Sequence, residues 1–347
     1  MLRKKSWLSV VALLIALSLV FTLAGCGGGS DTAKEPAEDQ APAADQQVQV
    51  NESALVIEAS ASYLGSGKGP TISAQEVYEN AVVGKDDSYQ IVSIRKPEDY
   101  AKGHVAGAIN IPYGEIYKAE NLAKLDKSKK IVVICYTGHT ASQVTRLLNQ
   151  LGYDAYAMKF GMMGWTSDEN VLNTKPFTKA PDYELETTVN EAQAVFDLPE
   201  ISTGKEAAED IILAQTEAYL TSGNGPTIPA QEVYEKAVVA KDPSYQILSI
   251  RKPEDYAKGH VPGAINIPYS DTANEENLKK LDPSKKIVVV CYTGHTASQT
   301  TIFLNQLGYD AYAMKFGMMG WTSDENALAT TPFAKAADYP TVAGENP

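Results

Sequence analysis

Hydrophobic and polar positions along this chain follow two periods, one typical of strands and one typical of helices. Short runs at residues 90–94, 131–134 and 155–159 predict buried strands, and the second of these runs is entirely β-branched. Longer segments at residues 52–64 and 140–151 predict helices with one buried face. Because strands and helices alternate over about 130 residues, the pattern predicts an α/β fold with a mostly parallel central sheet.

Shorter elements are predicted between these segments. Ser73 and Glu76 fit a capping box at the start of a second helix. A short helix is expected from Pro97, a short strand at residues 109–111 and a further helix at residues 116–125.

The same pattern occurs twice. Adding 156 to a residue number maps one half of the chain onto the other without a gap, from about residue 52 to residue 183. Residues 94–105 are identical to residues 250–261, whereas Pro229 replaces the helix cap Ser73, so this cap is expected to be lost in the second copy. A period this long is far longer than that of a solenoid repeat, so each copy is expected to be a whole domain.

The expected organisation is therefore two α/β domains, each with a mostly parallel sheet flanked by helices. The first domain spans residues 52–183 and the second spans residues 207–347. Residues 184–206 have no periodic pattern and are expected to be a linker.

The N-terminal residues predict export and lipid attachment. Residues 1–25 combine a basic start with a long apolar run, as a signal peptide does, and they end in Leu-Ala-Gly before Cys26, which resembles a bacterial lipobox. Lipidation of Cys26 would anchor the chain to the cell membrane on its extracytoplasmic side, and residues 26–51 would form a flexible tether. An uncleaved signal anchor is the alternative.

Composition narrows the set of partners. The net charge is −13, and loss of residues 1–25, which hold three positive and no negative side chains, changes it to −16. Such a charge argues against nucleic acid as a partner. The three cysteines are Cys26, Cys135 and Cys291. With Cys26 lipidated no disulfide framework remains, and a Cys135–Cys291 bridge is not expected because each cysteine would lie in its own domain's pocket.

The two remaining cysteines have the same surroundings. Residues 131–142 recur at residues 287–298 with one change, from Ile134 to Val290. Each cysteine follows a buried strand and precedes a short glycine-containing turn and a helix. Backbone N–H groups and the helix dipole favour negative charge at such a place, so Cys135 and Cys291 are candidate nucleophiles. A small buried core residue is the alternative.

These residues resemble the rhodanese (sulfurtransferase) family over both repeats. Residues 94–112 are similar to the family's first signature, an arginine at a strand end followed by E-x-x-x-G-H-I-P-G-A-x-x-x-P, and the second copy has the proline of this motif at Pro262. The cysteine at the strand end, its six-residue loop and a late Gly-x-x-x-Trp at residues 161–165 match as well. The resemblance implies two rhodanese-like domains.

The resemblance also implies a reaction. In the family a cysteine thiolate takes the outer sulfur of a small donor, holds it as a persulfide and passes it to a thiol or a cyanide-like acceptor. Cys135 and Cys291 would be catalytic, with no cofactor and no metal. The loop residues that would bind the donor are Tyr136, Thr137, Gly138, His139 and Thr140 in the first repeat and Tyr292, Thr293, Gly294, His295 and Thr296 in the second.

The chain departs from the family pattern at charged positions. Ser93 and Ser249 stand where the family has an aspartate. Members that use thiosulfate have cations just after the cysteine, where this chain has Tyr136 and Thr137, which leaves His139 as the candidate cation of the loop.

Two arginines are candidates for a second role. Arg95 and Arg251 are expected either to be structural, paired with a carboxylate such as Glu98, or to bind an anion near the site.

The cysteine loop also differs from those of other cysteine-dependent proteins. Phosphatase and arsenate reductase chemistry needs an arginine at the end of the cysteine loop, where this chain has Ala141 and Ala297. One cysteine and one histidine four residues apart do not make a zinc site. A non-catalytic module that binds a partner or carries sulfur remains the alternative.

Overall fold

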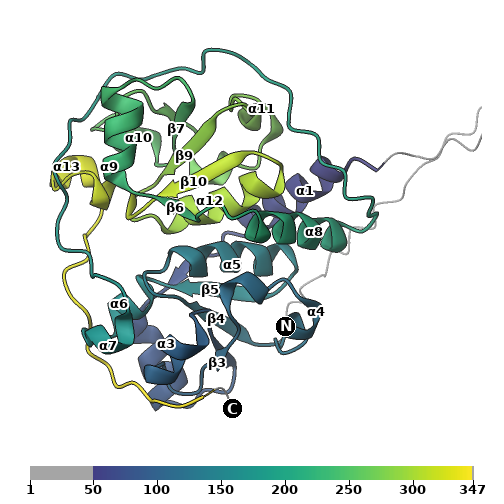
Figure 1. The fold of residues 1–347 in the computed structure, drawn as a ribbon, viewed down its shortest axis with the longest axis vertical. Coiled ribbons are helices and arrows are strands. Elements are labelled where there is room, and N and C mark those ends of the chain that lie inside the picture. Colours follow the sequence, from purple (N-terminus) through teal and green to yellow (C-terminus); the bar gives the residue numbers. More distant parts are fainter. Residues whose placement is uncertain (1–49, 346–347) are drawn as a thin grey trace, which may run out of the picture. The chain divides into compact units, whose positions relative to one another are not determined.

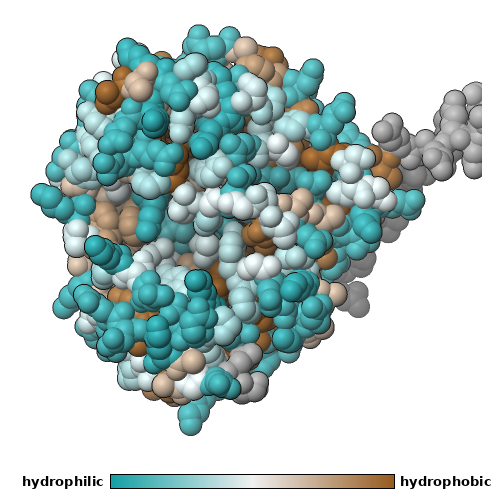
Figure 2. All heavy atoms as spheres, in the orientation of Figure 1, coloured by the Kyte–Doolittle hydropathy of each residue, from teal (hydrophilic) through white to brown (hydrophobic). Residues whose placement is uncertain are grey.

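The computed structural model describes residues 50–345, which belong to one compact unit (Figure 1). The expected signal peptide, Cys26 and nearly all of the expected tether lie outside these residues. Within residues 50–345 no helix has the length and apolar character needed to cross a membrane. The face of the molecule drawn in Figure 2 is mostly hydrophilic, with smaller hydrophobic areas.

The first repeat alternates helices and strands as expected. Its elements are, in chain order, α1 (Glu52–Gly65), β1 (Thr71–Ile72), α2 (Ala74–Glu76), η1 (Val77–Val83), β2 (Tyr89–Ser93), α3 (Pro97–Lys102), β3 (Ile109–Asn110), η2 (Tyr113–Glu115), α4 (Ala119–Leu122), β4 (Lys130–Ile134), α5 (His139–Gln150), β5 (Asp154–Met158), α6 (Gly161–Trp165) and α7 (Glu169–Leu172).

The second repeat has the same order. Its elements are α8 (Ala208–Thr221), β6 (Thr227–Ile228), α9 (Ala230–Glu232), η3 (Val233–Val239), β7 (Tyr245–Ser249), α10 (Pro253–Tyr256), β8 (Ile265–Asn266), η4 (Tyr269–Asp271), α11 (Glu275–Leu278), β9 (Lys286–Val290), α12 (His295–Gln306), β10 (Asp310–Met314), η5 (Gly317–Gly320) and α13 (Glu325–Leu328).

Each repeat contains a five-stranded parallel sheet. The strand orders are β1-β5-β4-β2-β3 and β6-β10-β9-β7-β8, so β4 and β9 are the central strands. Both central strands are buried after their first residue, which explains their unbroken β-branched composition. The predicted α/β architecture with two parallel sheets is confirmed.

The local predictions are confirmed with one exception. Ser73 caps its helix by accepting a hydrogen bond from the Glu76 N–H at 3.0 Å, and Pro229 forms no side-chain cap in the second repeat. The helix expected over the whole of residues 116–125 is wrong, because only α4 within this range is helical and the residues on both sides of it form turns. The Asn121 side chain donates to the carbonyl of Glu115 at 2.8 Å, which satisfies the end of the first turn and lets the chain change direction.

The two repeats pack through their helices, with α5 against α12 between the two sheets (Figure 1). One hydrophobic core contains residues of both repeats. At its edge Gln150 and Gln306, which are 156 positions apart, donate hydrogen bonds to each other at 2.8 and 3.1 Å. Contact between equivalent residues is the mark of two-fold symmetry, so the repeats meet as the two subunits of a symmetric dimer would.

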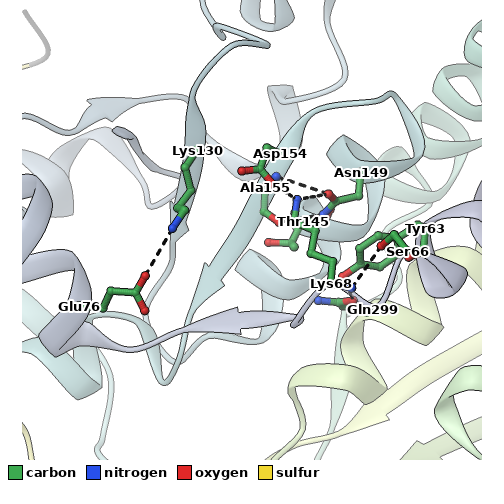
Figure 3. A network of polar contacts seen from close by, with 10 residues as sticks. All are labelled: Tyr63, Ser66, Lys68, Glu76, Lys130, Thr145, Asn149, Asp154, Ala155 and Gln299. Atoms are coloured by element: carbon green, nitrogen blue, oxygen red, sulfur yellow. Dashed lines mark hydrogen bonds and ion pairs between the residues drawn. The ribbon is translucent and has the colours of Figure 1, made fainter. Parts of the chain in front are cut away.

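Figure 3 shows polar contacts around α5, of which one joins the repeats and the others lie within the first repeat. The Tyr63 hydroxyl, on α1, donates to Gln299 of α12 at 3.0 Å. Lys68, which follows α1, donates to Asn149 at 2.7 Å and forms an ion pair with Asp154.

The segments that follow each repeat are exchanged. The Trp321 indole of the second repeat donates to the carbonyl of Glu184 at 2.9 Å, in the segment expected to be a free linker. The Trp165 indole of the first repeat donates to the carbonyl of Pro340 at 3.0 Å, near the end of the chain. The C-terminal segment, included above in the second domain, therefore packs on the first.

Candidate active site

Each cysteine lies between the end of a central strand and the start of a helix. Cys135 follows β4 directly and its side chain is 2% exposed. The Gly138 N–H donates to the Cys135 Sγ at 3.0 Å, and the Gly294 N–H donates to the Cys291 Sγ at 3.1 Å. Both sulfur atoms are therefore in contact with a backbone donor at a helix N-terminus.

The Gly-x-x-x-Trp motif at residues 161–165 forms backbone hydrogen bonds with the cysteine loop. The Met162 N–H donates to the carbonyl of Cys135 at 2.8 Å, and the Met163 N–H donates to the carbonyl of Tyr136 at 2.9 Å. A Cβ atom on Gly161 would lie 2.4 Å from the Cys135 carbonyl oxygen, so this close approach requires glycine. The backbone of the loop is thus fixed by α6.

Tyr136, the first residue after Cys135, is held in place by a hydrogen bond of its side chain. Its hydroxyl donates to the Asp99 carboxylate at 2.6 Å, and burial together with this hydrogen bond raises the pKa of Tyr136 far above its usual value. Tyr292 and Asp255 repeat the contact at 2.6 Å, and the same causes raise the pKa of Tyr292 to about 12. Both phenols are therefore neutral, and each donates its hydroxyl proton to a carboxylate.

His139 and His295 are buried at the contact between the repeats. His139 Nε2 accepts a hydrogen bond from the Phe316 N–H at 2.9 Å, and His295 Nε2 accepts one from the Phe160 N–H at 2.9 Å. The proton of each ring is therefore on Nδ1, which lies 2.9 Å from a threonine hydroxyl of the same loop, that of Thr137 in the first repeat.

The burial of these histidines leaves the cysteine loop without the positive charge that was expected of His139. Burial, with smaller contributions from His295 and Lys315, holds the pKa of His139 well below its usual value. Burial also lowers the pKa of His295, to about 3. The expectation that His139 supplies positive charge is therefore wrong, because the ring is neutral and accepts a backbone N–H.

The two cysteine loops face each other across the pseudo-two-fold axis. The His139 and His295 rings are stacked, with centroids 5.9 Å apart and planes 13° apart. A Cβ atom on Gly138 would lie 2.4 Å from His295 Nε2, and Gly138 has a φ of 89°. Glycine at this position thus permits both the turn after the cysteine and the close packing of the second repeat.

The arginines bind the backbone. The Arg95 guanidinium is fully buried and donates to the carbonyls of Val171, at 2.8 Å, and Gly103. Arg251 likewise donates to carbonyl oxygens of its own repeat. The pairing of Arg95 with Glu98 is therefore wrong, and the guanidinium groups tie the strand end to the segments around it.

A cavity of about 220 Å³ opens at Cys135, and both repeats contribute to its lining. Its lining residues are Cys135, Tyr136, Thr137, His139, Thr140, Asn173 and Thr174 from the first repeat and Pro226, Thr227 and Lys315 from the second. The loop residues expected at the site are thus brought together around the thiol in the first repeat. Lys315 and its neighbours were missed, because nothing in the cysteine loop indicates which segment of the other repeat covers it.

The chemistry available at this site is nucleophilic. A cysteine sulfur with a backbone donor opens to a cavity large enough for a small molecule. Residues 50–345 hold no group of three or more His, Cys, Asp or Glu side chains placed to bind a metal ion. Cys135 and Cys291 are both free thiols.

Comparisons with known proteins agree with this geometry. The model of the rhodanese-like domain family matches residues 73–168 and 231–324. The chain is 32% identical over 85 residues to YrkF of Bacillus subtilis, covering 24% of this chain and 45% of YrkF, so it spans less than half of that relative. It is 31% identical over 88 residues to YtwF of the same organism, covering 25% of this chain and 84% of YtwF.

A third relative is named for its activity. The chain is 37% identical over 62 residues to the thiosulfate sulfurtransferase PspE of Escherichia coli, covering 18% of this chain and 60% of PspE. Relatives of this kind support sulfur transfer at the level of the family. With two matched segments, each built around a cysteine loop at the end of a central strand, the chain belongs to the rhodanese-like family and contains two rhodanese-like domains in tandem.

Proposed function

We propose that this protein is an extracytoplasmic sulfurtransferase that moves sulfane sulfur through persulfides at Cys135 and Cys291. The observation that supports this most is the pair of sulfur atoms, each with a glycine N–H at 3.0 or 3.1 Å and each at the start of a helix. A persulfide placed there would keep its negative charge beside the same donors.

The proposed reaction has two displacement steps. The Cys135 thiolate attacks the outer sulfur of thiosulfate, so that a new S–S bond forms and the S–S bond of the donor breaks. Sulfite leaves with the electron pair, and the enzyme holds Cys–S–S⁻. A thiol or cyanide then attacks the terminal sulfur, takes it and releases the thiolate. No external oxidant or reductant is needed. In each step the attacking nucleophile supplies an electron pair and the leaving group departs with one, so the transferred sulfur keeps its oxidation level.

Thiosulfate is the first donor to test. PspE, which is 37% identical over the matched 62 residues, is named a thiosulfate sulfurtransferase. The cavity at Cys135 has the size for such a small donor and is lined mostly by polar side chains and by Lys315.

The proposed location rests on the N-terminal residues alone. Lipidation of Cys26 after cleavage would tether the two domains outside the cytoplasm through residues 26–51. Growth with a labelled fatty acid should label the protein, and Cys26→Ser should remove the label. A labelled Cys26→Ser protein would contradict the assignment.

A non-catalytic sulfur carrier is the second candidate. The burial of both thiols, each 2% exposed, favours it, since a carrier needs to protect its persulfide more than to exchange it quickly. A carrier would form the persulfide once and show no turnover.

Turnover separates the two candidates. Thiocyanate formed from thiosulfate and cyanide is measured for the wild type, Cys135→Ser, Cys291→Ser and the double variant, each with a denaturation midpoint as a control for folding. We expect each single variant to keep one active site and the double variant to have none. Equal rates in the wild type and the double variant would show that neither cysteine is catalytic.

A further inference from the structure

The cavity at Cys135 takes its positive charge from the other repeat. Of the residues that line it, Lys315 alone carries a cationic side chain, because His139 is neutral. Neither residue that follows the cysteine, Tyr136 or Thr137, is charged, and Arg95 is fully buried and committed to backbone carbonyls. The positive charge at this cavity thus comes from the other repeat and not from the cysteine loop.

The position of Lys315 is fixed by contacts on both sides. Its N–H donates to the carbonyl of Ile228 at 2.9 Å, which extends the pairing of β10 with β6. The next residue, Phe316, donates its N–H to His139 Nε2 at 2.9 Å. Lys315 therefore stands between the edge of its own sheet and the cysteine loop of the first repeat.

The Lys315 ammonium is available to a ligand. It lies 5.4 Å from the centroid of the Phe316 ring. It forms no ion pair with any side chain that the structure describes. A partly buried ammonium without a carboxylate, at a cavity without other charge, favours binding of an anion.

The second repeat has the reciprocal arrangement. The Lys159 N–H donates to the carbonyl of Ile72 at 2.9 Å, and its ammonium lies 5.3 Å from the Phe160 ring centroid. The Phe160 N–H donates to Nε2 of His295 at 2.9 Å, and His295 lies four residues after Cys291. The contacts of Lys159 and Phe160 beside the Cys291 loop thus match those of Lys315 and Phe316 beside the Cys135 loop. Lys159 too has no ion-pair partner within residues 50–345.

We propose that each repeat supplies the anion-binding cation of the other repeat's cysteine site: Lys315 binds the charged end of the substrate at Cys135, and Lys159 does so at Cys291. This inference rests on the proposed sulfur transfer and specifies its donor class, a small sulfane-sulfur compound with an anionic oxygen-bearing group. The lysine takes part through its charge alone, which balances the charge of the leaving group. The two sites are therefore composite, and neither is complete in one repeat.

Two alkylating reagents test this inference without relying on sulfur transfer. A cysteine thiolate displaces iodide from both iodoacetate and iodoacetamide. The two reagents differ in charge, because only iodoacetate is an anion. In a Cys291→Ser background, the ratio of the iodoacetate rate to the iodoacetamide rate is measured at Cys135 by intact mass. Lys315→Met should lower this ratio about five- to tenfold, because it removes one positive charge and keeps an unbranched side chain that is one atom shorter. Lys315→Arg should restore most of it.

A matched lysine and the reciprocal pair complete the design. Lys335→Met removes an exposed charge of the C-terminal segment, outside the lining of the Cys135 cavity, and should leave the ratio at Cys135 unchanged. In a Cys135→Ser background, Lys159→Met should lower the ratio at Cys291 by a similar factor. An unchanged ratio for Lys315→Met, or an equal fall for Lys335→Met, would overturn the inference.

Steady-state kinetics then separate this inference from the proposed function. In the Cys291→Ser background, Lys315→Met should raise the KM for thiosulfate by a larger factor than it lowers kcat. Sulfur transfer with an unaffected KM and an unaffected alkylation ratio would leave the proposed function standing without the trans lysine. A changed alkylation ratio with no sulfur transfer from any donor would refute the function and leave the anion site.

Discussion

Mild acid is expected to destabilise this protein through the histidines at the repeat contact. His139 and His295 are buried, and the Nε2 atom of each accepts a backbone N–H from the other repeat at 2.9 Å. Protonation would replace that acceptor with a second N–H and place a charge between the two loops. Each ring is therefore neutral in the folded protein, whereas in the unfolded chain it titrates near 6.5.

The size of the effect follows from proton linkage. Burial lowers the folded-state pKa of both histidines, so the unfolded chain binds more protons and stability falls as the pH decreases below 6.5. The stabilisation is complete above pH 6.5 and is lost progressively toward the folded-state pKa, which is about 3 for His295. Between about pH 7.5 and about pH 5.5 each histidine should lose about 1.4 kcal/mol of unfolding free energy, or about 2.7 kcal/mol for the pair.

A glutamine variant isolates one of these contributions. His139→Gln keeps an acceptor for the Phe316 N–H but does not titrate, so its free energy of unfolding should fall by about 1.4 kcal/mol less than that of the wild type over the same pH interval. Burial also lowers the pKa values of His104 and His260, but their contributions are present in both proteins and cancel. Urea denaturation at the two pH values measures the difference. An identical pH dependence in the wild type and His139→Gln would refute the neutral, accepting histidine.

Two further changes should affect stability in opposite directions. Arg146 is fully buried on α5, and its guanidinium lies near the Tyr269 hydroxyl and over the Tyr63 and Phe303 rings. It has no carboxylate partner among residues 50–345, and the second repeat has Ile302 at the equivalent position. Arg146→Met should therefore raise the free energy of unfolding by about 1–3 kcal/mol in urea denaturation, and a fall would contradict this account of the helix contact. Deletion of residues 338–347 should destabilise the first repeat by about 2–5 kcal/mol, because it uncovers Trp165 and removes its hydrogen bond to Pro340. A red shift of tryptophan fluorescence should accompany the loss, and an unchanged spectrum and midpoint would argue against the tail exchange.

The fold of each repeat could be predicted from the sequence because its elements are local. The β-branched run at residues 131–134 and the helix after Cys135 each have a pattern that nearby residues determine. The shortening of the helix expected at residues 116–125 to α4 could not be predicted, since the turn before α4 depends on the Asn121 side chain donating back to the Glu115 carbonyl.

The surroundings of the cysteine loops could be predicted only in part. The position of Cys135 at a strand end and a helix start follows from sequence order, but the partners of His139 and Lys315 do not. A period of 156 residues indicates two copies without indicating which faces of the copies pack together. Once α5 packs on α12, His139 is covered by Phe316 and loses the solvent that would keep it charged.

The most direct test of the central claim is the intact mass of the protein after it reacts with a sulfur donor. The part of the chain that the structure describes, residues 50–345, is treated with thiosulfate and measured without reductant. We predict adducts of about 32 Da at two sites in the wild type, at one site in Cys135→Ser or Cys291→Ser and at none in the double variant, with every adduct removed by cyanide. No adduct with thiosulfate, polysulfide or mercaptopyruvate, or an adduct that persists in the double variant, would contradict sulfur transfer through these cysteines.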